Sequence, residues 1–521
     1  MARASPRVVT LSRPLLLVAL GCVAACSRFG STDPSGAADG TDAGADDAHA
    51  GADDALGPVI GVAAPEGCDS AAEPHLSLAC VVDSYGVFVD SAAGADSSAG
   101  TQASPVKSIG GALRKLGARA RIYVCEGTYD EHVKLTTATS IYGGFACGTW
   151  AYSGKRPRVA PSDSGFALQI DKVGSALVVE DMDFTAMPGT ESASSSIAAF
   201  VTGSANLTLR RVSLTAQNGS KGKDGAAGDA GTLVTSSPTP GSRDGNASNS
   251  AGGKATGGAA QTCTCSTGAV TMGGSGGTIF PGGGVIPTAG APAQVVAAPP
   301  GADGSIGKFF AFGTESTPPK RGSDAPVPAW GLGAACNASI AGGGLHLCAG
   351  GDGTDGPQGQ GGGGAAPIAD NTSQLAAMAG GGGGGCGGCG GHKGKGGDGG
   401  GASVALVSVD SGVTLAACAL TAANGGAGGA GGGGGVAISG GQGGSGGRAP
   451  AGGAGGSGAA GSSGGGGAGG VTAGVVYKGA KPKADATIAT GARGGKGLGG
   501  VPGSNDGLDG SKADVLEVRG E

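Results

Sequence analysis

The sequence is short of the large and charged side chains that ordinary globular domains use. Only 14% of its 521 residues are charged and 3% are aromatic, both below the usual content of a globular chain. A large compact core needs large side chains, so the composition favours an extracellular, non-enzymatic class of protein. The chain also lacks a cluster of lysine and arginine, and its net charge is −6. Both features argue against a nucleic-acid partner, because phosphates attract clustered cations.

The apolar run near the start of the chain, residues 15–23, is too short to span a bilayer. Basic residues precede this run and small residues end it, which is the pattern of a bacterial export signal over residues 1–25. The segment Val23-Ala24-Ala25-Cys26 resembles the lipobox of bacterial lipoproteins. The resemblance implies that Cys26 is acylated, becomes the mature N-terminus and anchors the protein in a membrane.

Two alternatives to lipidation at Cys26 stay open. Cys22 also follows small residues, but Leu20 in the middle of its motif is bulky. An ordinary cleaved secretory peptide has the same arrangement of charge and apolar residues. The residue after Cys26 is Ser27, and in enteric lipoproteins a residue other than aspartate at this place permits transfer to the outer membrane. We therefore expect an exported protein that is lipid-anchored in the cell envelope, at the outer membrane or the cell surface.

The residues after the signal change character at about position 65. Residues 26–64 are rich in Ala, Gly and Asp and bury too little apolar surface to fold, so we expect a flexible tether. A strand over 86–90 that ends in an acid, a short helix over 109–116 and the segment Ile122-Tyr-Val-Cys-Glu-Gly-Thr-Tyr129 follow. These features resemble the start of pectate-lyase-like right-handed parallel β-helix proteins. The resemblance covers about residues 86–216 and implies an all-β solenoid with an N-terminal cap.

Internal repeats predict the same architecture without reference to a family. The segments 177–186, 207–216 and 413–422 carry apolar residues in the same four columns, beginning with Leu177, Leu207 and Val413. Two alternating pairs separated by a two-residue corner suit one coil of a β-solenoid, because successive strand side chains point to opposite faces. A weaker fourth copy covers 475–477 and 486–490. The sequence therefore predicts that these segments stack as successive coils.

Glycine separates the repeats. Of the 119 glycines, 24 precede Gln217 and the other 95 fall in the last 305 residues. Asn218-Gly219 and Asn424-Gly425 follow two of the repeats. Asn-Gly is typical of tight turns, so we expect the strands to end there. The predicted divisions are a cap and first coils at 65–216, a Gly-rich, Cys-containing insertion at 217–401, a coil at 402–423, a second Gly-rich insertion at 424–473, a last coil at 474–490 and a Gly-rich tail at 491–521. Insertions at one corner would gather on one face of the solenoid.

Two states of the insertions fit the sequence. Glycine recurs at every third residue over 219–231 and 350–362, and 425–456 is mostly Gly-Gly-X. Collagen shares this period, but it needs abundant proline and long unbroken runs. The pattern resembles packed polyglycine-II helices and the Gly-rich repeats of mycobacterial PE-PGRS surface proteins. Disorder is the alternative, because glycine loses the most backbone entropy on ordering.

The cysteines fit an oxidising compartment. Of thirteen, Cys22 leaves with the signal and Cys26 is acylated, while Cys418 shares a column with Met182 and Val212 and is expected to be a small buried residue. Ten then remain for disulfides.

Four of these ten surround the cap, where Cys68–Cys80 and Cys125–Cys147 are the expected local bridges. The other six lie in the first insertion, and the sequence does not fix their connectivity. They are Cys263, Cys265, Cys336, Cys348, Cys386 and Cys389.

Three motifs invite a ligand-binding interpretation that we do not adopt. Cys386, Cys389 and His392 have metal-ligand spacing, but thiols in this compartment oxidise, so disulfides are favoured and we expect no metal or cofactor. Residues 350–357 resemble one calcium-binding nonapeptide of the RTX type, but no tandem copy follows. The glycine triplets near Lys221 form no phosphate-binding loop, because no Gly-Lys-Ser/Thr follows a strand.

Enzymes with the β-helix fold cleave acidic polysaccharides with clustered acids and a basic residue. The candidates here are Glu180, Asp181, Asp183, Arg210 and Arg211, and strand spacing places Asp181 about 5 Å from Arg211. We expect a surface ion pair. An outward groove where three or more acids meet lysine or arginine would favour an enzyme, and a flat surface of small residues would favour a passive scaffold.

We therefore expect a lipid-anchored envelope protein that serves as a structural, adhesive or interaction scaffold, with no catalytic residue. Its partners would be the membrane, through the lipid on Cys26, and cell-surface polysaccharide or other envelope proteins. The alternative is a polysaccharide-binding or polysaccharide-cleaving β-helix protein of the lyase or glycoside hydrolase type. Sugar binding favours exposed aromatic rings, and the chain has two tryptophans, Trp150 and Trp330.

Overall fold

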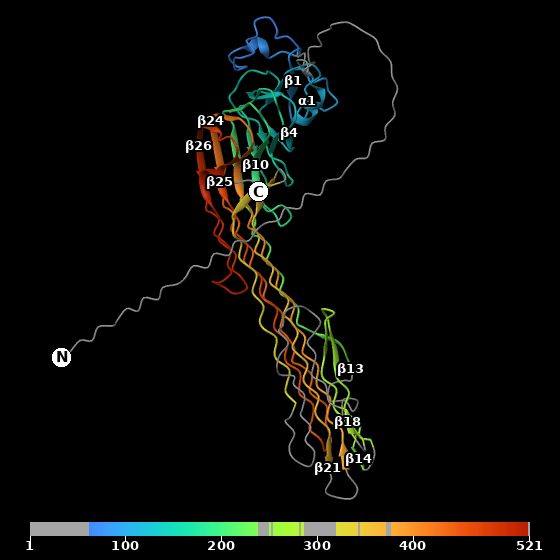
Figure 1. Ribbon diagram of the computed structural model, residues 1–521. Coiled ribbons are helices and arrows are strands. Elements are labelled where there is room, and N and C mark those ends of the chain that lie inside the picture. Colours follow the sequence, from blue (N-terminus) through green and yellow to red (C-terminus); the bar gives the residue numbers. More distant parts are fainter. Residues whose placement is uncertain are drawn as a thin grey trace, which may run out of the picture. The chain divides into compact units, whose positions relative to one another are not determined.

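Parallel strands stack in three faces that wind around a common core (Figure 1). The computed structural model describes residues 62–237, 249–251, 254–280, 283–285, 319–341, 344–370, 377–446 and 448–518. All of them belong to one compact unit, Ile60–Glu521. The predicted signal, nearly all of the tether and Cys26 lie outside the described residues. No helix in the described part of the chain is long and apolar enough to cross a membrane.

The first two faces form one curled sheet in which β24 runs through both. Its order is β1-β2-β5-β8-β11-β24-β12-β9-β6-β3, and β26 pairs with β24. The strands of the first face are β1 (Gly86–Val89), β2 (Arg121–Cys125), β5 (Ser140–Phe145), β8 (Leu177–Glu180) and β11 (Leu207–Arg210). Those of the second are β3 (Thr128–Tyr129), β6 (Arg158–Val159), β9 (Asp183–Thr185) and β12 (Ser213–Ala216), and the strands that cover both are β24 (Val413–Ala422) and β26 (Lys483–Thr490).

The third face has the order β27-β25-β23-β10-β7-β4. Its strands are β4 (Val133–Leu135), β7 (Leu168–Asp171), β10 (Ser196–Thr202), β23 (Ser403–Val409), β25 (Thr472–Lys478) and β27 (Lys512–Glu517). All pairings within the three faces are parallel. The architecture is the predicted right-handed parallel β-helix.

The repeats stack in the predicted register. Leu207 pairs with Leu177 on one side and with Val413 on the other. In the next inward column Val179, Leu209 and Leu415 are all buried. Apolar residues that share a column in the sequence thus form a continuous core along the β-helix, which is how the alternating pattern leads to the fold.

Equivalent residues in successive coils also share the corners between faces. Asp181, Arg211 and Ala417 turn the same corner with φ of 53°, 51° and 52°. Left-handed backbone at non-glycine residues is uncommon, and here it is repeated because each coil must bend at the same point. The corner therefore places the side chains of consecutive coils beside one another.

A short helix closes the N-terminal end of the β-helix. Helix α1 (Ile109–Lys115) begins after Ser108, whose hydroxyl accepts a hydrogen bond from the Gly111 amide. The Glu131 carboxylate accepts two more, from Ile109 and Gly110 at 2.7 and 2.8 Å. These bonds satisfy amides that a helix start leaves unpaired. The 3-10 turn η1 (Leu78–Cys80) precedes this cap.

The segment predicted as a Gly-rich tail contains one more strand. β27 pairs with β25, with Val475 opposite Val515. The apolar residues of β27 are Ala513, Val515 and Leu516. Its alternation of apolar and polar residues is therefore too weak to predict a strand.

The first insertion carries short antiparallel pairs that the sequence did not predict. They are β13 (Leu233–Ser237) with β15 (Thr262–Cys265) and β16 (Val270–Met272), β14 (Asn249–Ala251) with β22 (Ala377–Ala379) and β21 (Ile368–Asp370), β17 (Thr278–Phe280) with β18 (Gly283–Val285), and β19 (Ala338–Ala341) with β20 (Gly344–Leu347).

The Gly-rich segments run side by side and bond to one another at every third residue (Figure 1). We call the segments 219–231, 322–334, 350–365, 382–401, 425–444, 453–470 and 494–510 the glycine bundle. Segment 382–401 is central. Its amides at Gly385, Gly388, Gly391, Gly394 and Gly397 donate to carbonyls of 453–465 at 2.8–3.0 Å. Other residues of the segment bond to 220–229, 350–365 and 426–444. A period of three is the period of an extended threefold helix.

The number of glycines in each triplet reflects how many sides of a segment are packed. Here a column is one of the three positions of the triplet, followed along a segment. In the outer segment 219–231 one column is glycine, and a Cβ on Gly222 would collide with the Asp398 carbonyl oxygen. In the central segment two columns are mostly glycine, because a Cβ on Gly394 would collide with the carbonyl of Gly432 and one on Gly396 with that of Gly350. The third column carries the side chains.

Candidate functional site

An acid–arginine cluster lies where the N-terminal segment crosses the corner that follows β8. It consists of Glu73, His75, Tyr152, Glu180, Asp181, Arg210 and Arg211. Glu180 pairs with Arg210 in the β-ladder, and Asp181 and Arg211 follow them at the corner. The repeat offset of 30 residues thus brings two acids beside two arginines.

Direct hydrogen bonds join these charges. Arg211 Nε lies 2.8 Å from Asp181 Oδ1, and Arg211 Nη2 lies 2.6 Å from Glu180 Oε1. Arg210 Nη1 lies 3.0 Å from Glu180 Oε2. Glu73, from the N-terminal segment, forms ion pairs with Arg211 at 2.9 Å and with Arg210 at 3.2 Å. The two arginines therefore link the N-terminal segment to two coils. Asp183, the remaining candidate, pairs instead with Arg156 at 3.2 Å.

The cluster is more buried than the surface ion pair that we expected. Glu180 and Asp181 are 2% and 3% exposed. Burial raises the pKa of Glu180 to about 7, although the neighbouring Arg211 and Arg210 act to lower it. The hydrogen bonds that Arg211 donates to the Asp181 carboxylate raise the pKa of Arg211. Neighbouring coils and the N-terminal segment bury these two carboxylates, whereas the side chains of Arg210 and Arg211 stay 29% and 28% exposed.

Two rings cover the cluster on one side. His75 stacks on Tyr152 with ring centroids 4.4 Å apart, and the Tyr152 hydroxyl donates to Asp181 Oδ2 at 3.0 Å. The ligand atoms of Glu73, His75 and Glu180 lie within 4.8 Å of one another, a spacing that a metal ion could bridge. Both carboxylates, however, already form ion pairs with arginines, and these positive charges oppose a cation.

This arrangement does not provide the open groove that a β-helix enzyme would need. Three carboxylates do meet two arginines, but Glu73 belongs to the N-terminal segment, and Glu180 and Asp181 are buried beneath that segment. The role that the acid–arginine cluster can fill is to attach the N-terminal segment to the β-helix through ion pairs.

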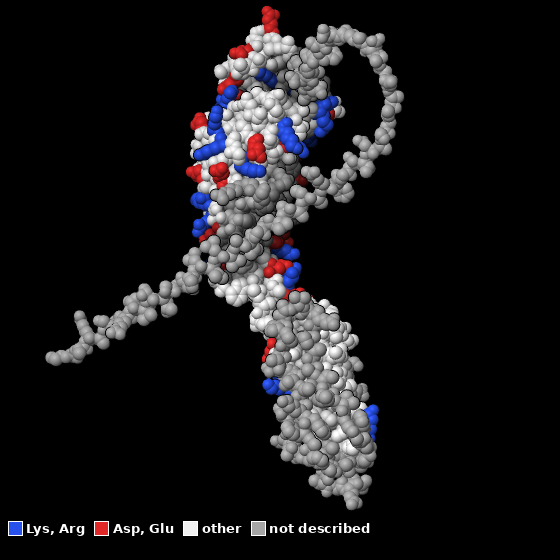
Figure 2. All heavy atoms as spheres, viewed as in Figure 1, with Lys and Arg blue, Asp and Glu red and all other residues white. Residues whose placement is uncertain are grey.

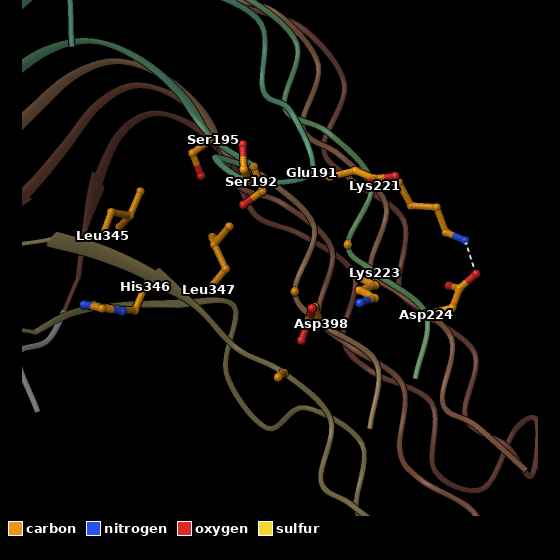
Figure 3. Close-up of a pocket in the computed structure, with 14 residues that line it drawn as sticks. Glu191, Ser192, Ser195, Lys221, Lys223, Asp224, Leu345, His346, Leu347 and Asp398 are labelled. Carbon is orange, nitrogen blue, oxygen red and sulfur yellow. Dashed lines mark hydrogen bonds and ion pairs between the residues drawn. The ribbon is translucent and has the colours of Figure 1, made fainter. Parts of the chain in front are cut away.

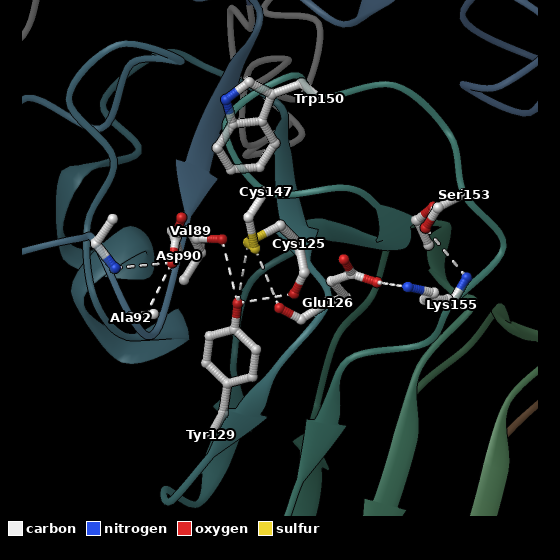
Figure 4. The surroundings of a disulfide bond; sticks show 12 residues. Val89, Asp90, Ala92, Cys125, Glu126, Tyr129, Cys147, Trp150, Ser153 and Lys155 are labelled. Atoms are coloured by element: carbon white, nitrogen blue, oxygen red, sulfur yellow. Dashed lines mark hydrogen bonds and ion pairs between the residues drawn. A yellow bond between two sulfur atoms is a disulfide. The ribbon is translucent and has the colours of Figure 1, made fainter.

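The predicted local disulfides, Cys68–Cys80 and Cys125–Cys147, are present. The second lies beside Asp90, Tyr129 and Trp150, which are buried (Figure 4). The Tyr129 hydroxyl lies 2.9 Å from the Cys125 carbonyl oxygen, and Asp90 accepts from the Ala92 amide at 2.9 Å. The cap is thus fixed by a covalent bond and a hydrogen-bonded shell.

The six cysteines of the first insertion pair as Cys263–Cys386, Cys265–Cys389 and Cys336–Cys348. The first two bridges join β15 to the central segment of the glycine bundle. Cys418 is free and buried in the core, in the column of Met182 and Val212.

The motifs set aside in the sequence have structural partners. Cys386 and Cys389 are in disulfides, and His392 lies 3.2 Å from the Ser266 hydroxyl. Asp352 of the RTX-like segment accepts from Lys395 at 2.8 Å. Trp150 is buried and Trp330 is half exposed.

A second candidate is a groove of about 760 Å³ at the junction of the β-helix and the glycine bundle. Its walls are the 191–195 loop between β9 and β10, the 221–224 segment, β20 and the 398–399 segment. Figure 3 shows Leu347 of β20 pointing toward the loop of Ser192, with Lys223 and Asp398 on adjacent Gly-rich segments. We call it the junction groove.

Sequence reasoning missed the N-terminal residues of the cluster and the whole junction groove. Glu73 and His75 stand in a turn-rich stretch with no repeat to place them. The groove joins residues more than 200 positions apart, Glu191 and Asp398 among them. No local pattern indicates such a juxtaposition.

Charges of both signs are interspersed over the face of the β-helix drawn in Figure 2. On that face the described residues form no large patch of one sign.

A family model described as "Protein of unknown function (DUF1565)" matches residues 92–181, a family associated with β-helix proteins. The match runs from the cap to the corner at Asp181, less than a fifth of the chain. No curated protein and no solved structure matches. The comparison therefore agrees with the β-helix fold.

Proposed function

We propose that this chain is an exported lipoprotein of the bacterial cell envelope that serves as a non-catalytic scaffold, anchored by a lipid on Cys26. The β-helix would carry the glycine bundle as a stiff extension that presents a surface to polysaccharide or to other envelope proteins.

The glycine bundle is the observation that carries this proposal. Its segments bond to one another at every third residue, and its central segment allows no Cβ at most positions of two columns. Such packing leaves few side chains for chemistry, whereas it holds long stretches of chain side by side through backbone hydrogen bonds. That construction suits a spacer or a presentation surface.

Two further features support export. The lipobox-like segment ends at Cys26, and five disulfides join ten cysteines of the described chain. Disulfides persist in oxidising compartments outside the cytosol.

Labelling with radioactive palmitate in the producing bacterium tests the anchor. We expect the wild-type chain and Cys22→Ala to incorporate label, and Cys26→Ala to incorporate none. Cys22→Ala is the matched control, because it removes the nearest other cysteine of the same apolar segment. Equal labelling of wild type and Cys26→Ala would remove the anchor from the proposal.

Polysaccharide cleavage is the alternative on this fold, and the acid–arginine cluster is the observation that would favour it. Glu180 and Asp181 are paired with arginines and buried beneath the N-terminal segment, so we place the scaffold function first.

A further inference from the structure

The walls of the junction groove are fixed by hydrogen bonds of the backbone and of one wall side chain, the Ser195 hydroxyl. The Ser220 amide donates to the Ser194 carbonyl at 2.9 Å, and the Ala402 amide donates to the Ser195 hydroxyl at 3.0 Å. Leu345 and Leu347 pack against a core cluster on the outer side of the third face. The 191–195 loop and β20 are therefore held on opposite sides of the groove before any ligand arrives, which lowers the cost of ordering on binding.

Charges of both signs alternate around the groove. Lys221 and Asp224 pair at 2.7 Å and neutralise each other. Among the residues that the structure describes, Glu191, Lys223 and Asp398 have no ion-pair partner, and all three are exposed. A ligand with a single strong charge would be attracted by one of these groups and repelled by another.

A neutral, hydroxyl-rich ligand satisfies both signs at once. A sugar hydroxyl donates to a carboxylate and accepts from an ammonium group or a serine hydroxyl. Leu345 and Leu347 offer an apolar patch for the C–H face of a sugar ring. The volume of about 760 Å³ also falls within the range of about 300–1,000 Å³ that small-ligand sites occupy.

We propose that the junction groove binds a short segment of neutral oligosaccharide through Glu191, Asp398 and Lys223. The inference deepens the proposed function by naming the class of partner. It rests on that function only for the location of the glycan, which would be the cell envelope. The contacts are made by side chains, which favours a glycan over an extended peptide that would bond through its backbone.

Calorimetric titration of the purified full chain tests the groove directly. The probes are the neutral trisaccharides cellotriose, maltotriose, triacetylchitotriose and mannotriose, with hexaglycine as the peptide probe. We expect saturable binding of at least one trisaccharide and none of hexaglycine. The double variant Glu191→Gln, Asp398→Asn should weaken the Kd about tenfold or more, because hydrogen bonds to charged groups are lost.

Both substitutions are isosteric and lie at exposed side chains, so the fold should be unaffected. Asp410→Asn is the control, since Asp410 is an exposed acid at a β-helix corner away from the groove, and its Kd should equal that of wild type. Three results would overturn the inference: no trisaccharide binds, hexaglycine binds in their place, or the double variant binds as wild type does. The titration needs no membrane, so its failure leaves the palmitate result intact.

Discussion

At the scale of single residues, Glu180 is a buried acid whose ionisation the β-helix disfavours. It is 2% exposed, and Arg210 and Arg211 both reach its carboxylate. Burial still raises its pKa to about 7. Between its ordinary pKa and this value the folded chain holds a proton that the unfolded chain releases, so the stability due to Glu180 is complete below about pH 4.5 and is lost as pH rises through 7.

Glu180→Gln isolates this contribution, because glutamine keeps the shape and cannot ionise. The quantity to compare is the free energy of unfolding of wild type minus that of the variant. We expect this difference to fall by about 3 kcal/mol as pH rises from 4.5 to 7. Urea denaturation followed by circular dichroism at a series of pH values measures it. A difference that stays constant, or that grows with pH, would contradict the buried position of Glu180.

The repeat offset was sufficient to predict which residues of two coils meet. It paired Asp181 with Arg211, because a residue and its equivalent one coil later share a corner. The same reasoning placed Cys418 in the core. It could not place Glu73 or His75, since these belong to no coil and reach the cluster only through the fold of the cap.

At the scale of elements, the central segment 382–401 explains why glycine appears twice in most triplets. The sequence indicated the period of three but left packing and disorder as alternatives. The collision partners decide which positions need glycine: Gly394 faces the Gly432 carbonyl, whereas no heavy atom lies near a Cβ built on Gly433.

Two alanine substitutions test this distinction. Gly394→Ala should destabilise the chain by about 2 kcal/mol, because the added methyl group overpacks a closed interface. Gly433→Ala, the matched control in the adjacent segment, should be neutral or stabilising by up to about 1 kcal/mol, since alanine restricts the unfolded chain. Thermal unfolding by scanning calorimetry compares the two. Equal effects of both substitutions would mean that the segments are not packed as described.

β27 marks the limit of prediction for elements. Its alternation is weak, and its place on the third face depends on the return of the chain from the last Gly-rich excursion. The antiparallel pairs of the first insertion were not predicted either. Their pairing partners are set by the disulfides and by neighbouring segments, and not by a local pattern in the sequence.

At the scale of the whole molecule, two constructions with different physical bases share one chain. The β-helix is stabilised by columns of buried aliphatic side chains. The glycine bundle is stabilised by backbone hydrogen bonds between segments that lie too close together to leave room for side chains at most positions. The apolar columns predicted the first, whereas nothing local in a Gly-Gly-X repeat states which segments become neighbours.

The most direct test of this account is amide hydrogen exchange of the full chain, followed by mass spectrometry. We predict that peptides from 382–401 and 453–470 exchange as slowly as those from β10 and β23, because their third-residue amides are bonded and the central segment is enclosed. Complete exchange of the Gly-rich peptides at the shortest labelling time, with the strands still protected, would contradict it.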